Sequence, residues 1–425
     1  MSLRLAASMG AAQTLVSMVL SFISIKITSV YLGPAGLGTL GQLTYFMGMT
    51  QAVLASGVGT GLVRRTAELG NDRPARERLI STVLRALLAV GIVAAVAVAL
   101  GSNWLARELL HDGQLGSPLI VFAAVFLFGL VATVIMSCAN GAKDFRTLAF
   151  INIGSGVSAF VMIAALTPYF GLMGGLVAMA GLPMVTCAIA WALARRHDWW
   201  PKRVLSHGFS AREARGAMAF VPMAIISSVG LPLMHLLIRD DVVAHSGMAA
   251  VGLLQGVMRI SDMYLGVASG VFAMYFFPRF SEIRDAGELR HEIQRGLLVI
   301  VPAVAGLSLA IYLLRDWIVH LIFTAEFLPM RELFGWQMIG NTLKMVGWLL
   351  GYVLLAKANT FAMAGLELVS IGVWWLLSVF FIGRNGVIGA TQAFALTYAI
   401  YSVVTLAGVI LVLKRMRTQP RTTIA

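Results

Sequence analysis

Six charged residues lie inside long apolar stretches of this 425-residue chain, where a charge needs a physical reason. The four cations and two acids are Lys26, Arg85, Arg259, Lys344, Asp262 and Glu367. A charge at the centre of a membrane helix costs about 2.5–3.5 kcal/mol on insertion scales, so such residues usually face a bundle interior or a watery cavity. Because cations are in excess, the sequence predicts a cavity for an anionic passenger, whose phosphate or carboxylate would exchange water for ammonium and guanidinium groups.

The four cations differ in how easily packing alone explains them. Arg259 and Asp262 stand at i and i+3 and could neutralise each other on one helix face. Arg85 lies near a predicted cytoplasmic end and could snorkel to the interface. Lys26 and Lys344 have no acid within helical reach, which makes them the strongest candidates for attracting a substrate. We predict a substrate cavity made by the four cations, with the two acids as candidates for pairing or proton coupling.

Uncharged polar side chains on the same stretches are candidates for hydrogen bonding to sugar hydroxyls. They are Gln51, Asn152, Gln255 and Asn341, and His235 near a predicted outer end could add positive charge at lower pH. Hydrogen bonds that pack helices together explain each amide equally well. Both interpretations stay open at the level of sequence.

Motifs for cofactor or metal chemistry are weak or absent. A GxGxxG formed by Gly36, Gly38 and Gly41 falls in a predicted turn between two spans, not between a strand and a helix. The chain has no GxxxxGK[ST], HExxH or CxxC motif, and Cys138 and Cys187 both lie in apolar stretches. We therefore expect no cofactor, no metal site and no enzymatic activity.

The composition predicts an all-α polytopic membrane protein. Hydrophobic residues make up 59% of the chain and charged residues 12%, against about 45–50% and about 25% in soluble proteins. A bilayer core about 30 Å thick needs about 20 apolar residues of helix, and lipid leaves the backbone no partner outside its own helix. Twelve spans are predicted, with approximate cores at 8–31, 39–62, 80–102, 118–140, 148–169, 174–194, 215–237, 249–276, 296–314, 333–356, 361–382 and 388–413.

The connections between these spans alternate in charge. Basic segments occur at 64–78, 195–215, 278–295 and in the tail 414–421, whereas the alternate connections carry few cations. Those few are Arg107, Arg239, Arg315, Arg331 and Arg384. The positive-inside rule then places both termini and the basic connections in the cytoplasm. This topology explains the net charge of +13 without a nucleic-acid partner.

The long connection 195–215 predicts two domains, 1–200 and 201–425, each a six-helix bundle. A loose internal repeat supports this division, since AKDF (142–145) follows the fourth span and AKANTF (356–361) follows the tenth. Repeated halves are common in transporters, which place the substrate site near the midplane between them.

The chain resembles the Wzx-type polysaccharide flippases. Twelve spans in two blocks, the YLGPAGLG turn (31–38) and the segment FTAEFLPMRELFGWQMIGNTLKMVGWLLGYVLLAKA (323–358) carry the resemblance, which runs along essentially the whole chain. These flippases belong to the multidrug, oligosaccharidyl-lipid and polysaccharide exporter superfamily. Within them, the likeness is greatest to those that carry the lipid-linked trisaccharide of enterobacterial common antigen.

The resemblance implies a V-shaped pair of bundles that works by alternating access. It implies that an undecaprenyl-pyrophosphate-linked oligosaccharide, of enterobacterial common antigen or O-antigen type, moves from the cytoplasmic to the periplasmic leaflet of a bacterial inner membrane. Lys26 and Lys344 match the family's cationic cavity in kind, while Arg259 beside Asp262 could mark a different glycan. Implied partners are this substrate, membrane lipids, and the glycan polymerase and chain-length regulator of the same pathway.

Two other functions are less favoured. A multidrug or cation antiporter of the same superfamily would need acids in its core, yet the first two predicted spans contain no Asp or Glu. A membrane glycan polymerase or ligase would need a large outer loop with reactive polar residues, and the longest outer connection, 315–332, is short.

Overall fold

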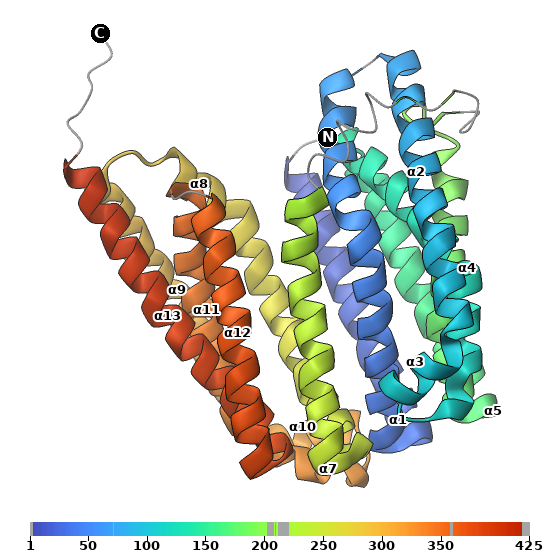
Figure 1. The fold of residues 1–425 in the computed structure, drawn as a ribbon. Coiled ribbons are helices and arrows are strands. Elements are labelled where there is room, and N and C mark those ends of the chain that lie inside the picture. Colours follow the sequence, from blue (N-terminus) through green and yellow to red (C-terminus); the bar gives the residue numbers. More distant parts are fainter. Residues whose placement is uncertain are drawn as a thin grey trace. The chain divides into compact units, whose positions relative to one another are not determined.

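The computed structural model consists of helices and the loops between them (Figure 1). It describes residues 3–70, 72–201, 208, 210, 221–357 and 360–418. The α-helices are α1 (Leu3–Leu69), α2 (Arg73–Leu100), α3 (Ser102–Leu109), α4 (Gly116–Gly141), α5 (Phe145–Ala194), α7 (Val221–Val271), α8 (Phe277–Glu282), α9 (Ala286–Leu313), α10 (Arg315–Ile322), α11 (Phe334–Lys357), α12 (Thr360–Asn385) and α13 (Val387–Thr418). Short helical turns are η1 (Gly113–Leu115), η2 (Phe272–Phe276) and η3 (Ala325–Glu332). No strand occurs in the described ranges, and the predicted all-α fold is confirmed.

Three helices are too long for a single crossing, because about 20 residues span a bilayer. α1 has 67 residues, α5 has 50 and α7 has 51. Each is broken at one glycine with left-handed backbone: Gly33 (φ 60°), Gly171 (φ 55°) and Gly247 (φ 79°). Glycine takes this conformation without a Cβ penalty. The described residues contain nine apolar helices long enough to cross a membrane, and counting the three broken helices twice agrees with the predicted twelve spans.

The glycine breaks follow the predicted repeat. Gly33 separates the first and second predicted spans, and Gly247 separates the seventh and eighth. Gly171 separates the fifth and sixth, and Gly386, also at positive φ, lies between α12 and α13, the eleventh and twelfth. The same two junctions of each six-span block therefore use a left-handed glycine, which supports the internal repeat more strongly than the short sequence echoes do.

Contacts divide the chain into unit 1 (Met1–Leu236) and unit 2 (Leu237–Ala425). The sequence places the division at 200/201, and the intervening stretch includes 202–207, 209 and 211–220, which lie outside the described residues. The predicted domain boundary stays a prediction.

In unit 1, α4 packs against α1, α2 and α5. One apolar cluster joins Leu79, Ile80 and Ile135 to the two tryptophans Trp199 and Trp200, which follow α5. In unit 2, α11 packs against both α9 and α13, and α12 packs against α13 (Figure 1). The central position of α11 decides which side chains can meet its polar residues.

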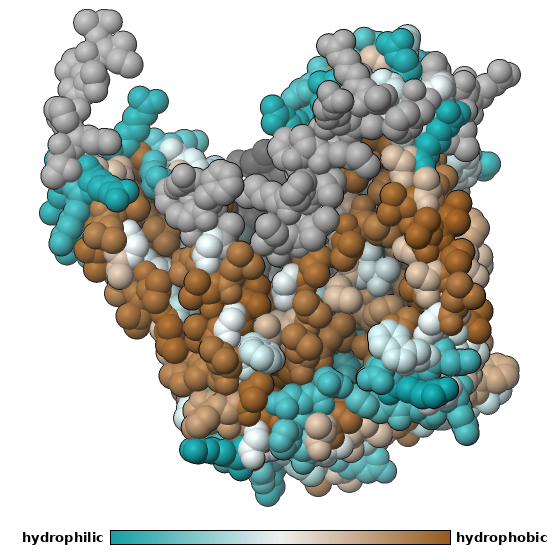
Figure 2. Space-filling view, viewed as in Figure 1, coloured by the Kyte–Doolittle hydropathy of each residue, from teal (hydrophilic) through white to brown (hydrophobic). Residues whose placement is uncertain are grey.

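The outer surfaces of the helices are apolar. Large hydrophobic side chains stay exposed along them, such as Val93, Leu298 and Val403. Figure 2 shows hydrophobic residues over the middle of the helices and hydrophilic residues at their ends. An apolar surface of this extent requires a nonpolar solvent, so the chain is a multi-pass membrane protein.

Candidate functional site

Lys344 of α11 lies in a cage of aromatic rings in unit 2. Its Nζ is 4.7 Å from the ring centroid of Trp348, 5.4 Å from that of Tyr398 and 5.7 Å from that of Phe394. Trp348 follows one turn later on α11, whereas the other two rings come from α13. Cation–π attraction is worth about 0.5–1 kcal/mol at exposed sites and about 2 kcal/mol or more after desolvation. The cage holds the ammonium group without neutralising its charge.

Asp262 of α7 is the acid that balances this cation. Its electrostatic attraction is strongest to Lys344, weaker to Arg259 and weakest to Arg239. Within the described residues Asp262 makes no direct ion pair with Lys344 or Arg259, and its side chain is exposed. The i,i+3 arrangement of Arg259 and Asp262 is therefore not a closed pair. We call Arg259, Asp262 and Lys344 the charge cluster of unit 2.

Aromatic residues of α13 connect this cluster to Glu367 of α12. The ring centroids of Phe394 and Tyr398 lie 4.8 Å apart, and those of Tyr398 and Tyr401 lie 6.2 Å apart. Tyr401 Oη donates a 3.3 Å hydrogen bond to Glu367 Oε1. Lys344 and Glu367, predicted separately from the sequence, thus lie at two ends of one row of rings.

Asn341 fixes the position of the charge cluster. Its side chain is fully buried, and Nδ2 donates to Ser261 Oγ at 2.8 Å and to Tyr264 Oη at 2.7 Å. Ser261 precedes Asp262 on α7, and Asn341 lies one turn before Lys344 on α11. These hydrogen bonds therefore set the register that brings the acid to the lysine. Contact between Asn341 and sugar hydroxyls stays a prediction.

Arg239 was wrongly placed by the sequence analysis. Instead of lying in an outer connection, it lies within α7 and is 1% exposed, with Nη2 donating to Gln255 Oε1. The predicted span ended at 237 because the charged run Arg239, Asp240, Asp241 interrupts the hydrophobic stretch. Gln255, a predicted cavity residue, is here the buried acceptor of this arginine.

The remaining predicted residues belong to unit 1. Lys26 on α1 and Arg85 on α2 are half-buried. Gln51 Nε2 donates to Thr133 Oγ1 at 3.1 Å, a bond between α1 and α4. Their roles toward a substrate stay predictions.

Two further predicted polar residues also lie in unit 1. Asn152 is half-buried on α5. The ring of His235 stacks on that of Tyr45, with centroids 4.7 Å apart. The predicted cavity residues therefore come from both units, and contact of Asn152 or His235 with substrate stays a prediction.

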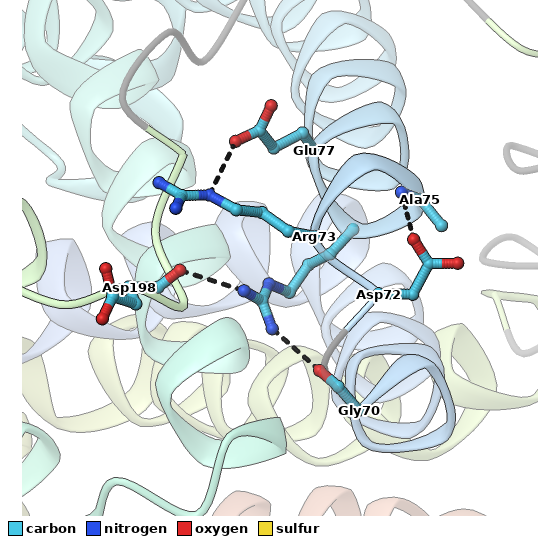
Figure 3. Close-up of polar contacts among 7 residues, drawn as sticks. Gly70, Asp72, Arg73, Ala75, Glu77 and Asp198 are labelled. Atoms are coloured by element: carbon cyan, nitrogen blue, oxygen red, sulfur yellow. Dashed lines mark hydrogen bonds and ion pairs between the residues drawn. The ribbon is translucent and has the colours of Figure 1, made fainter.

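A second polar cluster, at one end of unit 1, escaped the sequence analysis. Arg76 is 8% exposed, and its guanidinium donates to Gly70 O and Asp198 O, each at 2.9 Å (Figure 3). Asp72 caps α2 through a 3.1 Å bond from the Ala75 amide. One buried arginine thus ties the connection before α2 to the segment after α5.

Asp144 continues this tie at the start of α5. Its carboxylate accepts hydrogen bonds from Thr147 Oγ1 at 2.8 Å and Trp199 Nε1 at 3.0 Å, and His197 Nδ1 lies 3.3 Å away. Burial works against the charge, but the hydrogen bonds from Thr147 and Trp199 outweigh it and hold the pKa of Asp144 below its usual range. The AKDF motif could have pointed to this cap and to Thr147, whereas His197 and Trp199 lie about 50 residues further on. We call Arg76, Asp144, Thr147, His197 and Trp199 the anchor of unit 1.

Comparisons with known proteins give one family and one fold. The family described as "Polysaccharide biosynthesis protein" matches residues 29–332. The "Lipid III flippase" of Escherichia coli (strain K12) is 28% identical over 408 residues, which cover 94% of this chain and 96% of that protein, and the Shigella flexneri protein of the same name gives the same figures.

Solved structures agree in architecture. An inward-facing multidrug resistance MATE family transporter of the MOP superfamily superposes with a TM-score of 0.78 at 15% identity, over 95% of this chain and 96% of that one. The lipid II flippase MurJ, in an inward closed conformation, superposes with a TM-score of 0.76 at 13% identity, over 97% and 89%. At these identities the likeness shows the fold alone.

Proposed function

The chain belongs to the polysaccharide biosynthesis protein family, and we propose that it is a flippase that moves a lipid-linked oligosaccharide across the inner membrane. Relatives that match nearly its full length are named flippases, and a lipid flippase is among the proteins that share its fold. It acts as a transporter rather than an enzyme. The substrate changes leaflet and no covalent bond is made or broken.

The charge cluster of unit 2 is the observation that supports a role in substrate binding. Lys344 is held by three rings, and Asp262 attracts it without closing an ion pair. A pyrophosphate carries more than one negative charge, so it can outcompete a single carboxylate for Lys344 and Arg259. Asp262 then keeps the empty site from binding small anions tightly. Lys26 and Arg85 supply the corresponding cations of unit 1.

The finer features follow from the sequence. The carried lipid is an undecaprenyl pyrophosphate with an oligosaccharide of enterobacterial common antigen or O-antigen type, and the polymerase and chain-length regulator of that pathway receive the product. Both termini face the cytoplasm, because the basic connections lie on their side. The prenyl tail stays in lipid throughout, since only the charged headgroup needs a polar path.

Complementation of a flippase-deficient strain tests this function. We expect Lys344→Ala to lower glycan export by about tenfold or more, because a hydrogen bond to a charged group is worth about 1.5–3 kcal/mol and about 1.4 kcal/mol is a factor of ten. Lys26→Ala tests unit 1 in the same way.

The matched control is Lys414→Ala, which removes an exposed lysine at the end of α13 and should leave export unchanged. Membrane levels of all variants are compared by immunoblot. No complementation by the wild-type chain in any glycan pathway would refute the flippase assignment. Normal export by the Lys26, Lys344 double variant would refute the cationic site.

A further inference from the structure

A pocket of about 600 Å³ opens at one end of unit 2, apart from the charge cluster. Its lining includes Tyr312, Arg315, Arg331, Glu332 and Trp336. These residues come from the end of α9, the start of α10, η3 and the first turn of α11, within and on either side of the connection 315–332 that the sequence places outside the membrane. Its volume falls within the range of about 300–1,000 Å³ typical of small-molecule sites. We call it the Trp336 pocket.

Two arginines give the Trp336 pocket a fixed positive charge. Arg315 Nη1 donates to Tyr312 O at 2.7 Å, and its guanidinium lies 4.2 Å from the centroid of the Tyr312 ring. Arg331 makes no hydrogen bond or ion pair to any part of the chain that the structure describes. A guanidinium presents paired donors that match a carboxylate. The first arginine is therefore held in place, and the second keeps its donors available.

Two aromatic rings and one acidic side chain restrict the class of ligand that the pocket can bind. Trp336 is 44% exposed and Tyr312 is 37% exposed, so both rings offer apolar surface at the pocket. Pyranose rings present an apolar C–H face to such surfaces, while their hydroxyls donate hydrogen bonds to carboxylates such as that of Glu332. A lipid phosphate has no pyranose ring to stack on these two aromatic side chains. The combination favours a sugar that also carries an acid group.

We propose that the Trp336 pocket binds an acidic pyranose of the glycan as it leaves the transport path. The carboxylate pairs with Arg315 and Arg331, the sugar ring stacks on Trp336, and Glu332 accepts a hydroxyl. This rests on the proposed function, because a flippase brings the glycan to that end of the protein. Trp336 lies eight residues before Lys344 on α11, about 12 Å along the helix, so the pocket is a second station, distinct from the pyrophosphate site.

Saturation-transfer NMR on the full chain in phosphatidylcholine nanodiscs tests the pocket. The probe is methyl β-D-glucuronide, compared with its neutral analogue methyl β-D-glucoside. We expect the glucuronide to bind about tenfold more tightly or better, and Arg331→Gln to remove that preference, since charge-assisted hydrogen bonds are lost. Trp336→Leu should weaken both sugars.

Two variants keep the test independent of folding. Arg384→Gln is the matched control, because Arg384 also stacks on a ring, that of Phe380 at 4.1 Å, but lies outside the pocket. Gly335→Leu removes no charge and fills the pocket, since a Cβ at Gly335 meets Tyr312 at 3.6 Å, an ordinary contact. We expect the first to bind like the wild type and the second to lose binding.

Equal binding of the two sugars, or binding that survives both Arg331→Gln and Gly335→Leu, would overturn the proposal. Glycerol phosphate that binds as tightly as the glucuronide would also overturn it, because the pocket would then recognise charge alone, as in a lipid headgroup. The experiment needs no transport. Sugar binding without export by the wild type would refute only the flippase function, and export without sugar binding would refute only the pocket.

Discussion

The anchor of unit 1 and the charge cluster of unit 2 differ in how their charged side chains are balanced. In the anchor, Arg76 and Asp144 have their hydrogen bonds completed by backbone and side chains nearby in the fold. In the cluster, Lys344 and Asp262 attract each other without direct contact, and the ammonium group of Lys344 is surrounded by aromatic rings rather than by hydrogen-bond acceptors. A charged group whose hydrogen bonds are made within the protein holds segments of the chain together. A charged group that is only partly neutralised can still attract a ligand.

The largest effect on stability should come from the anchor. Arg76→Leu leaves the carbonyls of Gly70 and Asp198 without their donor, and hydrogen bonds to a charged group contribute about 1.5–3 kcal/mol each. We expect the unfolding free energy to fall by about 3 kcal/mol or more, measured by thermal or denaturant unfolding in detergent. Arg73→Leu is the control three residues earlier, where an exposed 3.4 Å pair with Glu77 is lost. It should cost no more than about 1 kcal/mol. Equal losses of unfolding free energy in the two variants would show that the buried Arg76 contributes no more to stability than the exposed Arg73.

A smaller effect is expected from the residue that positions the charge cluster. Asn341→Leu breaks the bonds to Ser261 and Tyr264, and hydrogen bonds between membrane helices are worth about 0.6–1.7 kcal/mol. Melting should shift modestly, while export should drop more sharply because Asp262 and Lys344 lose their register. Thr342→Val is the control on the same helix, because the Thr342 hydroxyl donates to Met338 O at 3.1 Å within α11. Loss of stability without loss of export in Asn341→Leu would show that the register does not matter for function.

The smallest effect concerns pH. Because the pKa of Asp144 is lowered in the folded protein, its stabilisation is fully present above the unfolded pKa of about 3.9 and is lost as pH falls through the folded value. The melting temperature of the wild type should therefore decline below about pH 4 more steeply than that of Asp144→Asn. Parallel declines in the two proteins would mean that the carboxylate adds nothing to the anchor.

Sequence predicted the all-α fold, and it singled out the charges within apolar runs for a simple reason. A lysine or an acid within an apolar run is visible without any knowledge of packing, as Lys344 and Asp262 show. The aromatic cage was not visible, because Phe394 and Tyr398 lie about 50 residues after Lys344 and reach it only through the packing of α13 on α11.

Two other features depended on geometry that periodicity does not reveal. Arg239 was assigned to a loop because hydrophobicity ends near it, while helix α7 continues. Two partners of Asp144, His197 and Trp199, come from residues after the long helix α5. In both cases the missing information was which distant backbone passes nearby, and a single sequence does not contain it.

Binding of a soluble anionic probe tests the central claim most directly. Farnesyl pyrophosphate, a short prenyl pyrophosphate, is titrated by calorimetry into the full chain in nanodiscs. The account predicts that Lys344→Gln weakens binding about tenfold or more and that Asp262→Asn strengthens it, because the internal competitor for Lys344 is removed. Unchanged affinity in both variants would contradict a substrate role for the charge cluster of unit 2.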